Sequence, residues 1–185
     1  MTLACVLLSL TLLHTTLASE WPCRWSRVRL VDVNDRCIQL LNEMNEMSAH
    51  FPVSCVTNER ARFYPQHLYE NNTSDSLTTI AMEAVQAVAE VYRGNMSSVS
   101  ASWRRDKVDL FTNLLSRQKR KLEPCVKSTE ATGRKSPGLK LYTDQLKSFL
   151  THQGNSLCAW EMARAEARHV LQEMKTLLKD SKRSS

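Results

Sequence analysis

The sequence CAWEMARAEARHVLQEMKTLL, from Cys158 to Leu178, is the clearest amphipathic helix in the chain. Its apolar residues recur at offsets of three and four, which places them on one stripe of an α-helix. They are Trp160, Ala163, Ala167, Leu171, Met174 and Leu178. Asn155 and Ser156 precede the run as candidate N-caps, and lysines gather at the far end, where they complement the helix dipole. We therefore expect Trp160 and Leu171 to lie in the core.

The two borders of this stripe differ in charge. Arg164, Arg168 and Lys175 lie along one border, whereas Glu166 and Glu173 lie along the other. Arg164 and Arg168 are one turn apart, close enough for one acidic patch to contact both. We expect this basic edge to contact a partner without filling the core.

The first residues indicate export from the cell. An apolar run over residues 3–13 is followed by small residues at 16–18, a pattern typical of a secretory signal peptide. The run is far shorter than the roughly 20 residues that span a membrane. We expect residues 1–18 to be removed and residues 19–185 to form a single secreted, extracellular domain.

Turn-forming residues are scarce, because the 185 residues include only 4 glycines and 5 prolines. This composition predicts an all-α domain. Apolar periodicity predicts about five helices, and Trp103 of the third belongs to the expected core. Four of these helices precede the Cys158 helix. The first covers residues 25–47, and the second covers 77–93 with Asp75 or Ser76 as its cap. The third covers 100–123 and is stopped by Pro124, and a short fourth helix begins at Pro137 and is closed by Gly154. The net charge of +6 favours acidic partners.

Residues 48–76 show no periodicity and predict a long crossover loop that contains Cys55. A long crossover lets two consecutive helices run parallel, so the pattern fits an up-up-down-down bundle of the helical-cytokine type. Arg60, Arg62, Phe63 and Tyr64 make this loop basic and aromatic, a composition suited to a protein interface. Phe63 and Tyr64 could equally seal the edge of the core.

Five cysteines remain once Cys5 is removed with the signal peptide: Cys23, Cys37, Cys55, Cys125 and Cys158. An odd number in a secreted protein leaves one thiol unpaired or intermolecular. Cys37 lies on the inward stripe of the first helix, so we expect a buried free thiol there rather than an intermolecular bridge or a redox role. The sequence alone leaves the pairing of the other four open.

No catalytic or metal-binding constellation is recognisable, so we expect neither an enzyme nor a cofactor. The run Arg117-Gln118-Lys119-Arg120-Lys121 has three interpretations: a nucleic-acid or heparin patch, a convertase site, or the solvated last turns of a helix. We favour the last and expect no nucleic-acid partner. Glycosylation sequons begin at Asn71, Asn72 and Asn95, all in predicted connections.

The string Cys158-Ala159-Trp160-Glu161, followed by Arg164-Ala165-Glu166, resembles the last-helix signature of the vertebrate type I interferons. Three other stretches agree, and together they cover nearly all of the mature chain. They are Ser97-Ser98 before Trp103 with Leu110, Phe111, Leu114, Gln118, Leu122-Glu123 and Cys125; Cys55 ten residues before Pro65 in Phe63-Tyr64-Pro65; and Leu139-Lys140-Leu141-Tyr142. The chain is most similar to the four-cysteine group of bony-fish interferons.

The resemblance implies disulfides between Cys23 and Cys125 and between Cys55 and Cys158. It also implies a secreted antiviral cytokine that brings together two class II cytokine receptor chains and triggers kinase-driven induction of antiviral genes. Carried over by position, one receptor surface comprises Val56, Arg60, Arg62, Arg164, Ala165, Arg168 and His169, and a weaker one on helices two to four includes Lys140.

Two alternatives remain beside the interferon interpretation. The basic edge of the last helix would suit a cationic host-defence protein that acts on microbial membranes, and the bundle would suit a helical cytokine of another family. The membrane alternative needs apolar stripes that the core already uses, so we expect no direct membrane insertion. We expect a monomer, with a dimer as the alternative.

Overall fold

The computed structural model describes residues 29–45, 55, 63, 74–94, 96–99, 101–127 and 137–180, and the described chain is almost entirely helical. The first helix is described over residues 29–43. It is followed by α2 (Ser74–Val91), the 3₁₀ turn η2 (Ser97–Val99), α3 (Arg105–Lys127), α4 (Pro137–His152) and α5 (Leu157–Asp180). Within these residues, extended pairing is confined to an isolated bridge between Asn45 and Trp103.

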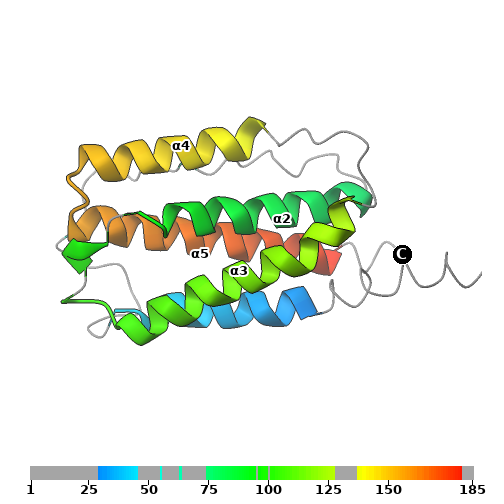
Figure 1. Cartoon of the computed structure of the whole chain (residues 1–185), viewed down its shortest axis with the longest axis horizontal. Coiled ribbons are helices and arrows are strands. Elements are labelled where there is room, and N and C mark those ends of the chain that lie inside the picture. The colour runs from blue at the N-terminus through cyan, green and yellow to red at the C-terminus, as the bar shows by residue number, and fades with distance from the viewer. Residues whose placement is uncertain are drawn as a thin grey trace, which may run out of the picture.

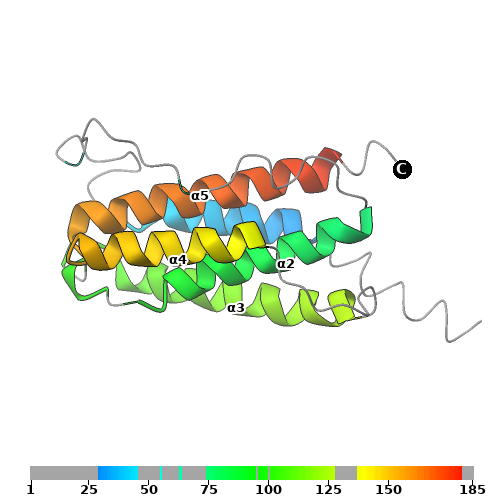
Figure 2. The ribbon, with the colours of Figure 1, turned by 90° about the horizontal axis from the view of Figure 1, so that it is seen from above.

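The helices form an up-up-down-down bundle with one additional helix. The colour gradient in Figure 1 shows the first helix and α2 running in one direction and α3 and α5 running in the other. The view from above in Figure 2 shows α4 beside both α2 and α5, and α4 contacts both helices. The predicted all-α cytokine bundle is confirmed.

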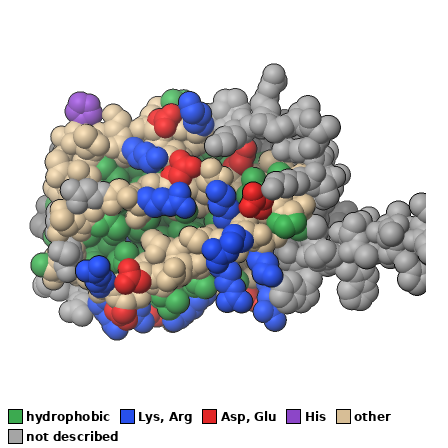
Figure 3. Space-filling model, viewed as in Figure 1, with side chains coloured by type: hydrophobic (Ala, Val, Ile, Leu, Met, Phe, Trp, Pro, Cys, Tyr) green, Lys and Arg blue, Asp and Glu red, His purple; other side chains and the backbone are tan. Residues whose placement is uncertain are grey.

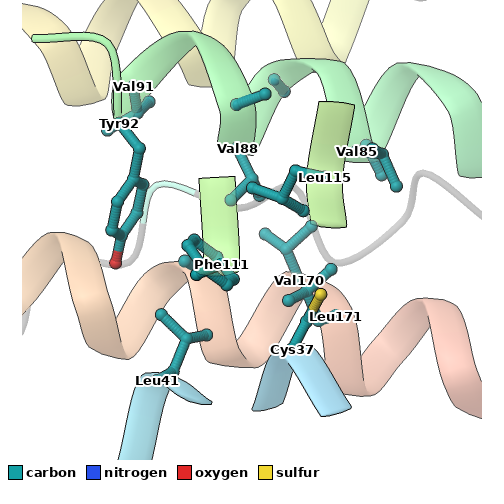
Figure 4. Close-up of a cluster of buried hydrophobic side chains, with 14 of the residues drawn as sticks. Cys37, Leu41, Val85, Val88, Val91, Tyr92, Phe111, Leu115, Val170 and Leu171 are labelled. Carbon is teal, nitrogen blue, oxygen red and sulfur yellow. The ribbon is translucent and has the colours of Figure 1, made fainter. Parts of the chain in front are cut away.

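Apolar side chains from the first helix, α2, α3 and α5 meet in a single core. Figure 4 shows Cys37 and Leu41 of the first helix facing Phe111 of α3 and Leu171 of α5, and all four side chains are fully buried. The predicted stripe of α5 is buried along its whole length, including Trp160. Burial at about 25 cal/mol per Å² of apolar surface makes this shared core the main source of stability.

Several helix boundaries differ from those predicted. The helix before the crossover ends at residue 43 rather than 47, because the Arg104 N–H binds the Met44 carbonyl (2.7 Å) and a bridge joins Asn45 to Trp103. α2 begins at Ser74, so the residues predicted as its cap lie inside its first turn. α3 begins at Arg105, which places Trp103 in the connection before the helix.

Pro124 does not stop α3, which continues to Lys127. A proline in a helix removes one hydrogen bond, here to the carbonyl of Arg120, and later residues can still bond to the preceding turn. On α3, Leu110 is 40% exposed, whereas Phe111 and Leu115 are fully buried. The inward side of α3 is therefore narrow.

The turn between α4 and α5 follows the sequence prediction. Gly154 and Asn155 both have positive φ, 59° and 51°, a conformation that ends helices and that glycine adopts without strain. The Asn155 N–H bonds back to the Leu150 carbonyl at 2.7 Å. Ser156 then caps α5, because its Oγ accepts a hydrogen bond from the Ala159 N–H at 3.3 Å.

The described parts of the crossover loop are attached to the bundle at two points. Cys55 forms a disulfide with Cys158 at the start of α5. Phe63 is partly buried and packs against Phe149 of α4, with ring centroids 5.2 Å apart, so it does seal the edge of the core. None of the helices in the described part of the chain is long and apolar enough to cross a membrane.

Candidate functional site on the last helix

The inward side of α5 contains a buried ion pair between Glu161 and Arg164. Glu161 is 0% exposed and Arg164 is 4% exposed. The guanidinium Nε and Nη2 of Arg164 both donate to Oε2 of Glu161, at 2.8 and 2.6 Å. The two residues are three positions apart on the helix, which places their side chains side by side.

Donors and acceptors from other elements complete this pair. Oε1 of Glu161 accepts hydrogen bonds from Asn45 Nδ2 at 2.9 Å and from Trp103 Nε1 at 2.7 Å. Arg164 Nη1 donates to the Leu41 carbonyl at 2.8 Å, in the last turn of the first helix, where carbonyls lack intrahelical donors. We call Asn45, Trp103, Glu161 and Arg164 the Glu161 cluster.

The Glu161 cluster fixes the end of the first helix on α5. Asn45 precedes the crossover loop, and Cys55, within the loop, is bonded to Cys158, one turn before Glu161. Both attachments therefore lie near the N-terminal end of α5. A buried charge pair with all its hydrogen bonds made gives a fixed geometry, since any displacement leaves a buried charge unsatisfied.

The prediction that Arg164 lies on an exposed basic edge is wrong. Its position at the border of the apolar stripe allows either orientation, and Glu161 together with the Leu41 carbonyl draws the guanidinium inward. A side chain that is 4% exposed offers almost no surface to another protein. We therefore remove Arg164 from the expected receptor contacts.

Ala165, Arg168 and His169 lie on the outward side of α5. All three are partly exposed. Arg168 Nη1 donates to Asn42 Oδ1 of the first helix at 3.3 Å, so this arginine lies across the seam between the two helices. Further along the seam Lys175 pairs with Asp35. These residues form a polar surface over two helices, and such a surface can bind another protein.

Comparison with known proteins identifies the family. The chain matches the sequence model described as the interferon alpha/beta domain over residues 27–181. It belongs to the type I interferon family. It is 27% identical to interferon tau-6 of Ovis aries over 184 residues, covering 94% of this chain and 91% of the relative. It is also 27% identical to interferon a3 of Oncorhynchus mykiss over 160 residues, 84% of each chain.

The structures agree with this assignment at the level of the fold. Zebrafish interferon 1 superposes with a TM-score of 0.66 at 22% identity, covering 86% of this chain and 97% of that one. Zebrafish interferon 2 superposes with a TM-score of 0.65 at 23% identity, covering 78% and 96%. Membership of the interferon family, not the structural similarity, makes the protein an antiviral cytokine and not an enzyme.

Several residues predicted for the interferon lie outside the described part of the chain. These are Val56, Arg60, Arg62, Tyr64, Cys23 and the sequon residues Asn71, Asn72 and Asn95. Cys125 is disulfide-bonded, but because Cys23 is not described the Cys23–Cys125 pairing stays a prediction. Lys140 is on α4 with 73% of its side chain exposed, and it lies 3.8 Å from Asp144.

The thiol of Cys37 is shielded from solvent in the folded state. Cys37 is free and fully buried, as predicted, and burial raises the pKa of its thiol to about 12. The thiolate that reacts with oxidants or alkylating agents is therefore scarce at neutral pH. Among the described residues no group of three or more His, Cys, Asp and Glu side chains could hold a metal ion.

The structural role of Glu161 was missed by the sequence analysis. A signal was present, because an acid and a base three residues apart directly follow Trp160, which the apolar stripe places in the core. A charged pair so close to an inward tryptophan indicates an internal ion pair. Its partners Asn45 and Trp103, 116 and 58 residues away, could not be found by periodicity.

Proposed function

We propose that this interferon acts outside the cell by bringing together two chains of a class II cytokine receptor and so starting kinase-driven induction of antiviral genes. Residues 1–18 would direct its secretion, and residues 19–185 would form the active domain. The main support is membership of the interferon family across residues 27–181. No step of this function requires a cofactor.

The proposed first receptor surface combines the outward side of α5 with the crossover loop. On α5 it comprises Ala165, Arg168 and His169, and the loop would contribute Val56, Arg60 and Arg62. The Cys55–Cys158 disulfide supports this grouping, because it ties the start of that loop segment to the N-terminal end of α5. Pre-organised contact groups lose less conformational entropy on binding.

The proposed second surface lies on α4 and includes Lys140. Its side chain is exposed beside a groove of about 150 Å³ between α2 and α4, lined by Ala87 and Leu139 among others. An apolar groove with a charged rim matches the usual anatomy of a protein interface. Two surfaces on different helices allow two receptor chains to bind one interferon molecule.

Binding kinetics with immobilised receptor ectodomain test the first surface. Replacing a charge at the rim of an interface mainly slows association. We expect Arg168→Ala to lower the association rate, with a smaller effect at high salt because exposed charges are screened there. Lys179→Ala is the matched control, since Lys179 is exposed on the same helix about 16 Å further along. Equal association rates for the two variants would remove Arg168 from the surface.

A further inference from the structure

A groove runs between the first helix and the C-terminal half of α3, away from both proposed receptor surfaces. Its volume is about 150 Å³. Its floor is apolar and its rim is cationic. We call it the basic groove: the floor is Leu30, Val33, Leu114 and Leu122, the rim is Arg29, Arg117 and Lys121, and Gln118 also lines it. Figure 3 shows Lys and Arg side chains gathered over the C-terminal half of α3.

The cations of α3 in this region share one side of the helix. At 100° per residue, Arg117, Arg120 and Lys121 fall within an arc of about 100°, and all three are exposed. The nearest acid on α3 is Glu123. It lies one turn after Lys119, and both residues are on a side of the helix outside this arc. Asp32, one turn after Arg29 on the first helix, is the exposed acid closest in sequence to the rim. The rim is therefore cationic overall.

Gln118 supplies a hydrogen-bond acceptor in the basic groove. The side chain is 4% exposed, and its Nε2 donates to Asn34 Oδ1 at 3.3 Å. Its Oε1 is buried and has no hydrogen-bond partner among the described residues. Because buried polar atoms are nearly always paired, this oxygen suits a ligand that brings a hydroxyl or amide donor.

We propose that the basic groove binds a sulfated polysaccharide. The sulfate groups would pair with the rim cations Arg29, Arg117 and Lys121 and with Arg120, which lies in the same arc of α3. The C–H faces of the sugar rings would cover the apolar floor, and a sugar hydroxyl would donate to Gln118 Oε1. The choice of a cell-surface polysaccharide rests on the proposed secretion. A volume of about 150 Å³ is too small to enclose a drug-sized ligand, for which pockets of about 300–1,000 Å³ are usual. An extended chain lying along the groove avoids this limit.

The same residues argue against a nucleic-acid patch and against a convertase site at the basic run. Single-stranded nucleic acids bind to cationic grooves that also present aromatic rings for base stacking, and no aromatic residue lines this groove. Arg117 to Lys121 are helical throughout, whereas proteases favour exposed loop tips. Since the basic groove is formed by the first helix and α3, a bound polysaccharide leaves the outward side of α5 and Lys140 uncovered.

Retention of the refolded mature protein on immobilised heparin tests the proposal. With four ion contacts, from Arg29, Arg117, Arg120 and Lys121, and the coefficient for single-stranded polyanions, affinity should fall about 20-fold between about 50 and about 150 mM NaCl. The double variant Arg117→Gln/Lys121→Gln should reduce that fall to about 5-fold and elute at lower salt. The matched control Arg93→Gln/Arg105→Gln removes two exposed arginines at the end of α2 and the start of α3.

The control should elute close to the parent protein, and melting curves should show all variants folded. If the two double variants lost retention on heparin equally, binding would depend only on net charge, and the proposal would be overturned. Retention on desulfated heparin equal to that on heparin, or equally tight binding of single-stranded DNA, would also overturn it. Since no receptor is used, failure here leaves the proposed function standing.

Discussion

Replacing Arg164 by methionine should destabilise the interferon far more than replacing Arg168. Arg164→Met keeps a long apolar side chain but removes every guanidinium contact, including those to Glu161 Oε2 and the Leu41 carbonyl. Glu161 is then a buried carboxylate with donors on one oxygen only. Losing one partner of a buried ion pair costs about 3–5 kcal/mol, whereas an exposed pair contributes about 0–1 kcal/mol.

Thermal and urea unfolding of the disulfide-intact protein measure this cost. For a domain of this size, a loss of about 3–5 kcal/mol lowers Tm by about 6–20 °C. Arg168→Met is the matched control, because it removes the same charge one turn further along a partly exposed seam, and Tm should change by only a few degrees. The double variant Glu161→Gln/Arg164→Met should be less unstable than the sum of its single changes, since no lone buried charge remains.

A different result would refute the reasoning. If Arg164→Met melted like Arg168→Met and instead lost receptor binding, then Arg164 would face the receptor in solution. If the double variant were simply additive, Glu161 and Arg164 would not act as a pair. Either outcome would show that the Glu161 cluster does not stabilise the fold through a buried ion pair.

Three further predictions concern Trp103, the Cys55–Cys158 disulfide and the thiol of Cys37. Trp103→Phe removes one donor to Glu161 Oε1 and should cost about 1–3 kcal/mol in urea unfolding, an effect that Glu161→Gln should reduce. Cys55→Ser/Cys158→Ser opens a disulfide with a sequence separation of 103 and should cost about 4–5 kcal/mol; an unchanged midpoint would show that the bridge does not constrain the unfolded chain. The raised pKa of Cys37 keeps the thiol neutral in the folded state, so stability is lost as pH rises above the unfolded value of 9.0. Through this thiol the parent protein should lose about 1.4 kcal/mol of stability between about pH 8 and 10, and Cys37→Ala should not show that loss. Equal pH profiles for variant and parent would contradict this.

The sequence predicted those features that depend on local spacing. The stripe of α5 follows from its period, the cap at Ser156 follows from side-chain chemistry, and the start of α4 at Pro137 follows from the fixed φ of proline. The fully buried Trp160 illustrates why this works, because a periodic apolar face can be stable only against other apolar faces.

The sequence did not predict those features that depend on distant partners. The interferon resemblance and the place of Arg164 at the border of the apolar stripe predict a receptor contact. Glu161, Asn45 and Trp103 instead form a polar site around this arginine inside the bundle. Pro124 failed as a stop signal for a related reason. Local rules state that proline disfavours a helix, but tertiary packing decides whether the helix tolerates one lost bond.

Reporter induction in matched cells with and without the receptor chains tests the central claim most directly. The refolded mature protein should activate the reporter and protect against virus only in cells that carry both chains. Arg168→Ala should require a higher concentration for the same response than Lys179→Ala. Antiviral or antibacterial activity of equal strength in cells or cultures without the receptor would contradict the account, because it would show that the protein acts without bringing receptor chains together.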